Sequence, residues 1–168
     1  MKLGPEIRAN IRYSAVIGND FAELPVPPAP ELLTRIRTGE LWGEVSLYPK
    51  DEQFPRASID WHEGHGFVFH CFENAESWGY FLTTGDVMSP PRIDIALGGQ
   101  AMEQWPRELF VGEILALEAL DFFLHSGERK PSLRWVRTDQ FPRIVVWEGR
   151  EGRQAWERSK ALKGEGDV

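Results

Sequence analysis

Two histidines three positions apart are the side chains in this sequence best suited to chemistry. His62 and His65 could supply imidazole nitrogens to a metal ion, with a nearby carboxylate as a further ligand. The zinc-protease pattern instead needs two histidines four apart on a helix. Gly64 and Gly66 favour a turn here, because glycine accepts positive φ. A metal-dependent enzyme that uses His62 and His65 is therefore an alternative, and a polar hairpin tip is the simpler interpretation.

The remaining reactive residues do not strengthen the enzyme alternative. His70 and Cys71 are neighbours on a predicted strand, where successive side chains point to opposite faces, so both cannot join one cluster. A cysteine in the middle of a strand is expected to be a buried, inert thiol. The Gly98-Gly99-Gln100 segment lacks the spaced glycines and the Lys-Ser/Thr pair of a phosphate loop, and no serine lies in a nucleophile-elbow context. We therefore predict no catalytic residue, no metal and no cofactor, in a protein that is not an enzyme.

Negative charge is concentrated in the middle of the chain. Residues 60–126 hold 11 acidic residues and only two basic ones, a balance of −9. The balance is −1 for residues 1–59 and +3 for residues 127–168. A concentrated acidic segment repels nucleic acid and attracts a basic partner. We therefore expect a protein partner with a basic surface and no nucleic acid; a solvated face that serves solubility is the alternative.

Length and composition are those of an ordinary globular protein. The 168 residues predict a single domain over residues 1–168, with a frayed tail at about 164–168. No apolar run approaches the roughly 20 residues that a membrane span needs, and the first residues do not form a signal peptide. Cys71 is the single cysteine, so no intrachain disulfide forms. These features predict a cytoplasmic protein without membrane contact, and they leave its oligomeric state open.

Alternating apolar residues predict most of the secondary structure as strands. The predicted strands occupy residues 6–17, 42–48, 57–61, 67–72, 77–83, 92–97, 133–137 and 144–147. The predicted helices occupy residues 31–38 and 110–126, with a marginal third helix over 152–162, and residues 24–30 are predicted to be a proline-rich extended connector.

The loop lengths and the apolar stripe of the main helix predict how these elements are arranged. The loops between the strands at 57–61, 67–72 and 77–83 are too short for parallel crossovers, so these strands form an antiparallel meander. Leu117 and Leu120 lie in the apolar stripe of the 110–126 helix and are expected to be buried. The sequence thus predicts an α+β fold, in which this helix packs on one face of an antiparallel sheet and a short N-terminal helix accompanies it.

Residues 97–136 carry a resemblance to a known family. The helix there ends in Ala119-Leu120, Phe123-Leu124 and Ser126-Gly127, followed by Arg129, Pro131 and Trp135. This order resembles the signature A-L-x-x-F-L-x-[ST]-G-x-R-P-x-x-x-W near the C-terminus of bacterial polymorphic-toxin immunity proteins, in the family numbered one. The chain departs from it because Lys130 stands between Arg129 and Pro131.

The resemblance implies a small α+β protein that binds and blocks a cognate toxin delivered between bacteria. Toxins of this kind are often nucleases or nucleic-acid deaminases, whose phosphate-binding active sites are basic. An acidic inhibitor suits such a partner, through charge complementarity and fast association. The expected toxin-binding residues are Asp60, Glu63, Glu73, Glu76, Trp78, Tyr80, Asp86 and Asp94. Their carboxylates would pair with basic side chains of the toxin, and the two aromatic rings would be anchors. A structural domain without this activity is a further alternative.

Overall fold

The computed structural model describes residues 10–14, 21–41, 45–49, 52–75, 78–88, 92–97 and 99–164. The chain divides into two compact units. Unit 1 comprises Met1–Val87 and Glu108–Gln140, and unit 2 comprises Met88–Arg107 and Phe141–Val168. A single domain over residues 1–168 stays a prediction, and so does the frayed tail, of which only Gly164 lies among the described residues.

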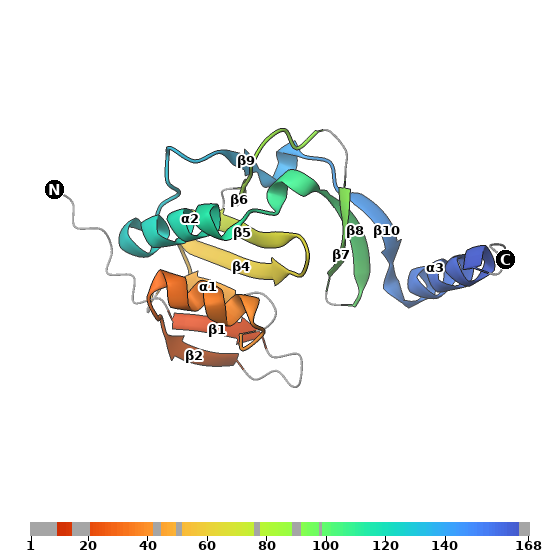
Figure 1. The fold of residues 1–168 in the computed structure, drawn as a ribbon, viewed down its shortest axis with the longest axis horizontal. Helices are drawn as coiled ribbons and strands as arrows, with labels where there is room; N and C mark the ends of the chain where they lie inside the picture. Colours follow the sequence, from red (N-terminus) through yellow and green to blue (C-terminus); the bar gives the residue numbers. More distant parts are fainter. Residues whose placement is uncertain are drawn as a thin grey trace. The chain divides into compact units, whose positions relative to one another are not determined.

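Unit 1 is built on a seven-stranded sheet whose neighbouring strands are all antiparallel, in the order β2-β1-β3-β4-β5-β6-β9 (Figure 1). Its strands are β1 (Asn10–Ser14), β2 (Phe21–Pro25), β3 (Val45–Tyr48), β4 (Arg56–His62), β5 (Gly66–Phe72), β6 (Tyr80–Leu82) and β9 (Trp135–Arg137). The predicted meander is confirmed in β4, β5 and β6. Strand β2 was not predicted, because its last residues fall in the proline-rich stretch assigned to a connector.

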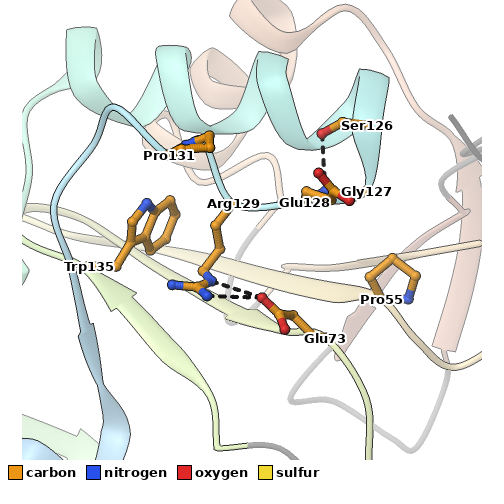
Figure 2. A pocket seen from close by; sticks show the side chains of 8 residues that line it. All are labelled: Pro55, Glu73, Ser126, Gly127, Glu128, Arg129, Pro131 and Trp135. Atoms are coloured by element: carbon orange, nitrogen blue, oxygen red, sulfur yellow. Dashed lines mark hydrogen bonds and ion pairs between the residues drawn. The ribbon is translucent and has the colours of Figure 1, made fainter. Parts of the chain in front are cut away.

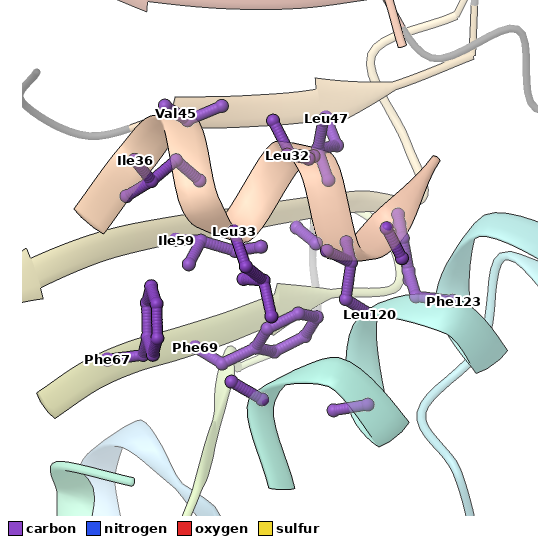
Figure 3. Close-up of a cluster of buried hydrophobic side chains, with 14 of the residues drawn as sticks. Leu32, Leu33, Ile36, Val45, Leu47, Ile59, Phe67, Phe69, Leu120 and Phe123 are labelled. Atoms are coloured by element: carbon purple, nitrogen blue, oxygen red, sulfur yellow. The ribbon is translucent and has the colours of Figure 1, made fainter. Parts of the chain in front are cut away.

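The core of unit 1 lies between its sheet and two helices. Helices α1 (Ala29–Arg37) and α2 (Glu113–Ser126) lie on one face of the sheet (Figure 1). Leu33 of α1 and Leu120 of α2 point toward Ile59 and Phe69 of the strands beneath (Figure 3). The predicted α+β fold is therefore confirmed. Two single turns of 3₁₀ helix, η1 (Arg107–Leu109) and η2 (Thr138–Gln140), follow β8 and β9 in the chain.

The C-terminal end of α2 and most of its buried face follow from its sequence, whereas the helix begins at Glu113, three residues later than predicted. Gly127 adopts the left-handed conformation, with φ of 71°, and its N–H donates to the carbonyl of Phe123 at 2.7 Å, which ends the helix as predicted. Leu120 is completely buried, whereas Leu117 is only half-buried, so the prediction for Leu117 was wrong. The reason is geometric: each residue turns the helix by about 100°, which places Leu117 to the side of the stripe centred on Ala116 and Leu120.

Unit 2 is a three-stranded antiparallel sheet, in the order β10-β8-β7, with a helix at its C-terminal end. Its elements are β7 (Arg92–Leu97), β8 (Ala101–Pro106), β10 (Ile144–Glu148) and α3 (Gly149–Gly164). Strands β7 and β10 and helix α3 were predicted, and β8 was not. No side chain of α3 is buried, since a largely polar sequence leaves the helix without an apolar face.

Candidate functional site

A pocket of about 550 Å³ opens in unit 1 where the loop after α2 passes the end of β5 (Figure 2). Its lining includes Glu73, Gly127, Glu128, Arg129, Pro131 and Trp135. Most of these residues come from the segment that carries the family resemblance. The pocket therefore connects that segment with Glu73, which was expected to bind a toxin.

Arg129 is the central residue of the pocket. Its Nε and Nη2 atoms both donate to Oε1 of Glu73, at 3.2 and 2.9 Å. Its guanidinium carbon lies 3.5 Å from the centroid of the Tyr80 ring and 6.0 Å from that of Trp135. The guanidinium is thus held by an ion pair on one side and by ring faces on another.

Glu73 is the more exposed partner of this ion pair. Its side chain is 51% exposed, compared with 25% for Arg129. Both hydrogen bonds from Arg129 end on Oε1, so Oε2 of Glu73 accepts neither of them. A carboxylate has about four acceptor sites, and it can receive a second cation from outside while it keeps the first. The arrangement is therefore suited to binding a lysine or arginine side chain of another protein.

The turn after α2 positions Arg129. Ser126 Oγ donates to the carbonyl of Phe122 at 2.7 Å and accepts the N–H of Glu128 at 3.1 Å. Together with the left-handed Gly127, these bonds direct the chain back over the sheet. The Ser-Gly pair of the signature therefore has a structural function in this chain, because it places Arg129 above Tyr80.

Lys130, the residue that departs from the signature, ties the same loop to α2. Its Nζ lies 2.6 Å from Oε1 of Glu118. Its carbonyl accepts the indole N–H of Trp135 at 3.0 Å. The added residue is thus held by its side chain and by its backbone carbonyl, and Trp135 still lines the pocket.

The structure brings two of the expected toxin-binding residues together. Glu73 at the end of β5 and Tyr80 of β6 meet at Arg129. Trp78 lies two residues before Tyr80 and is 56% exposed. One face of the Tyr80 ring is covered by the guanidinium, so Tyr80 supports Arg129 more than it offers a free anchor. Glu76 lies outside the described residues.

The other four expected residues do not join this group. Asp60 points to the opposite face of the sheet, where its Oδ2 lies 2.6 Å from Nε2 of His62. Glu63, in the turn between β4 and β5, accepts the indole N–H of Trp61 at 2.9 Å. Asp86 is exposed in the loop after β6. Asp94 belongs to β7 of unit 2, where it accepts Nε2 of Gln104 at 3.0 Å.

Arg129 and Trp135 were missing from the expected site, although both lie in the quoted signature. The expected site residues were chosen mainly from the acidic segment at residues 60–126. Arg129 falls outside it, in residues 127–168, which have an excess of positive charge. The Ser126-Gly127 pair was the signal in the sequence, because it indicates a turn that returns the chain toward the sheet and places Arg129 near its acidic side chains.

The histidines of the β4–β5 hairpin contact a ring and a carboxylate. The rings of His62 and His65 lie against Phe110, with centroid distances of 5.2 and 5.8 Å, and His62 also contacts Asp60. No group of three or more His, Cys, Asp or Glu side chains arranged for a metal ion occurs among the described residues.

Cys71 lies on the helix-covered face of β5, close to the Glu73–Arg129 pair. Burial raises the pKa of its thiol well above the ordinary value, although the nearby positive charge of Arg129 opposes this shift. The thiol is therefore neutral near pH 7, and thiolate chemistry at this position is disfavoured.

No family model, curated protein or solved structure matches this chain. In the part of the chain that the structure describes, no helix is long and apolar enough to cross a membrane. The function proposed below therefore rests on the resemblance of residues 97–136, on the site geometry and on the charge distribution.

Proposed function

We propose that this protein binds a cognate bacterial toxin domain in the cytoplasm and neutralises it by stoichiometric protein–protein inhibition. The proposed toxin is a nuclease or a nucleic-acid deaminase with a basic surface, and the inhibition requires neither catalysis nor a cofactor. The observation that carries the proposal is the pocket in which residues of the immunity-protein signature surround the Glu73–Arg129 pair.

The distribution of charge between the two units supports this proposal. Unit 1 contains 19 of the 26 acidic residues and 11 of the 19 basic ones, a balance of −8. Unit 2 contains the remaining 7 acidic and 8 basic residues, a balance of +1. A basic toxin is therefore attracted to unit 1, which carries the pocket, and this long-range attraction accelerates association at low salt.

At short range, the proposed contact is a basic side chain of the toxin with Glu73. The incoming cation approaches the oxygen of Glu73 that Arg129 does not occupy. The exposed ring of Trp78, close by in the chain, adds apolar contact area, as aromatic residues do in binding hot spots. Arg129 keeps the carboxylate in place, which lowers the entropic cost of the new ion pair.

The test is binding and inhibition of the toxin domain encoded by the adjacent gene. We expect a complex of one inhibitor with one toxin, and an association rate that falls steeply as salt is raised while the dissociation rate changes less. Glu73→Gln should weaken binding by roughly 2–5 kcal/mol, mainly through faster dissociation, because it leaves the cation of the toxin unpaired. Trp78→Ala should also weaken binding.

Two matched variants provide controls. Glu52→Gln removes the same charge from an exposed carboxylate outside the pocket, and it should change only the association rate, by a small factor. Ile114→Ala removes an exposed apolar side chain from the same unit, and it should leave binding unchanged. If Glu73→Gln binds within a factor of two of the parent, the pocket is not the interface. If the parent neither binds nor inhibits the toxin, the proposed function is wrong.

A further inference from the structure

Exposed apolar side chains are concentrated in unit 2. Among the described residues, six large apolar side chains are exposed, and four of them belong to this smaller unit: Met88, Ile144, Val145 and Leu162. Ile144 and Val145 are consecutive residues of β10 and are 46% and 56% exposed. Adjacent β-branched residues on a strand are well suited to pairing with another strand.

Strand β10 lies at the edge of its sheet. It pairs with β8 on one side, and no strand of the described part of the chain pairs with it on the other. An edge strand presents a row of backbone N–H and C=O groups that a further strand can use. The edge of β10 thus combines a side that no described strand pairs with and exposed apolar side chains; on the other side, a bulge between Val145 and Trp147 interrupts its register with β8.

The two ends of β10 carry opposite charges. Arg143 precedes the strand and Glu148 is its last residue. Both side chains are exposed, and neither forms an ion pair or hydrogen bond with another described residue. When a strand with such ends meets an antiparallel copy of itself, the positive end of each strand lies beside the negative end of the other. Opposite charges across paired strands are stabilising, and two-fold symmetry supplies the contact twice.

We infer that β10 is a dimerisation edge, along which two copies of this chain pair antiparallel. The two small sheets then join into one sheet in the order β7-β8-β10-β10-β8-β7. Because the contact uses the same strand in both copies, it is saturated once the dimer forms, and it does not propagate into a filament.

A second copy fits this edge better than the proposed toxin does. Helix α3 directly follows β10 and carries five basic residues and two acidic ones, so its charge repels a basic toxin. A second β10 strand carries charges of both signs at matching positions. The inference does not depend on the proposed function, since Glu73 and its pocket belong to unit 1.

Sedimentation equilibrium of the full-length chain, from micromolar to millimolar concentration, tests the inference. We expect a monomer–dimer equilibrium. Arg143→Glu and Glu148→Arg should each raise the dissociation constant of the dimer by roughly tenfold or more, because two attractive pairs become two repulsive ones. An equimolar mixture of these two variants should dimerise about as well as the parent, since the heterodimer restores both attractive pairs.

Two further variants separate the strand from the remainder of unit 2. Val145→Lys should abolish the dimer, whereas Leu162→Lys, which changes an exposed apolar residue of α3, should not. Far-UV circular dichroism and thermal melting confirm that each variant is folded.

Three results would overturn the inference. The first is a parent chain that remains monomeric at millimolar concentration. The second is a dimer that is insensitive to both charge reversals, or one that their mixture fails to restore. The third is a monomeric parent whose binding to the adjacent toxin domain is weakened by Val145→Lys, which would assign the edge to a strand of the toxin.

Discussion

Replacement of Leu120 by alanine measures how strongly α2 holds the core of unit 1 together. The Leu120 side chain is completely buried in the cluster formed by α1, α2 and the central strands (Figure 3). The change removes three carbon atoms, worth about 2–3 kcal/mol at about 0.8 kcal/mol per methylene. The cavity that remains raises the expected cost toward about 5 kcal/mol, because a close-packed core relaxes only in part.

Urea unfolding is the appropriate assay for this loss. With a slope of about 2 kcal/mol per molar urea, in the middle of the usual range, the loss lowers the midpoint by roughly 1–2.5 M. Ile114→Ala is the matched control, because Ile114 lies on the same helix and is 83% exposed, so its loss should stay within about 0.5 kcal/mol. The half-buried Leu117 should give an intermediate value. A loss below about 0.5 kcal/mol for Leu120→Ala would refute the buried role of this face of α2.

Three further predictions concern the thiol, a close backbone approach and the histidines. Since burial raises the pKa of Cys71 in the folded state, its contribution to stability is complete below the unfolded pKa of about 8.5 and declines as pH rises above it. The free energy of unfolding should therefore decrease there by up to about 1.4 kcal/mol per pH unit, and Cys71→Ala should remove this dependence. Gly79→Ala should cost about 1–3 kcal/mol in urea melts, because the new Cβ would lie 2.1 Å from Nε2 of His70. Elemental analysis of protein purified without a metal-affinity tag should find no stoichiometric zinc, and His62→Ala with His65→Ala should leave folding and inhibition intact.

The controls for these predictions are equally specific. Cys71 is the single cysteine, so a thiol reagent reports on it alone, and reaction in the folded protein as fast as in denaturant would contradict its burial. Gly164→Ala places a Cβ where no atom lies within 4 Å, so a loss equal to that of Gly79→Ala would rule out the steric explanation. One zinc per chain, lost in the double histidine variant, would establish the metal site that we do not expect.

The strands and helices that were predicted correctly are those for which the apolar pattern and the loop lengths indicate the same arrangement. Strands β4 and β5 alternate along the chain and are joined by a turn too short for anything but antiparallel pairing. Strand β8 was not predicted, because the order Ala-Met-Glu-Gln-Trp-Pro does not alternate, and its pairing with β7 and β10 decides its conformation. Tertiary pairing of this kind overrides local preference, and a single sequence does not reveal it.

The candidate site was less predictable because its central contact joins residues that are far apart in the sequence. Glu73 and Arg129 are separated by 56 positions, and no local periodicity relates them. Glu73 and Tyr80 were identified from the charge and the aromatic content of their segment. Their placement on one side of the sheet follows from the pairing of Tyr80 with Cys71, which the sequence leaves open.

The fold divides the acidic segment between the two units. This division separates the effect of charge on the association rate of the proposed complex from its effect on the dissociation rate. The acidic segment at residues 60–126 does not remain whole, since Asp94 and Glu103 lie in unit 2 while α2 stays in unit 1. Arg129 comes from a segment with an excess of positive charge, and it neutralises part of the negative charge of Glu73. In the proposed complex, the remaining negative charge of unit 1 should act over a distance and set the association rate, which salt reduces. Glu73, held by Arg129, should act mainly in contact with the toxin and set the dissociation rate of that complex. Glu52→Gln and Glu73→Gln each remove one negative charge, but they should affect different rate constants. Loss of the exposed Glu52 carboxylate should slow association, whereas loss of the paired Glu73 carboxylate should speed dissociation.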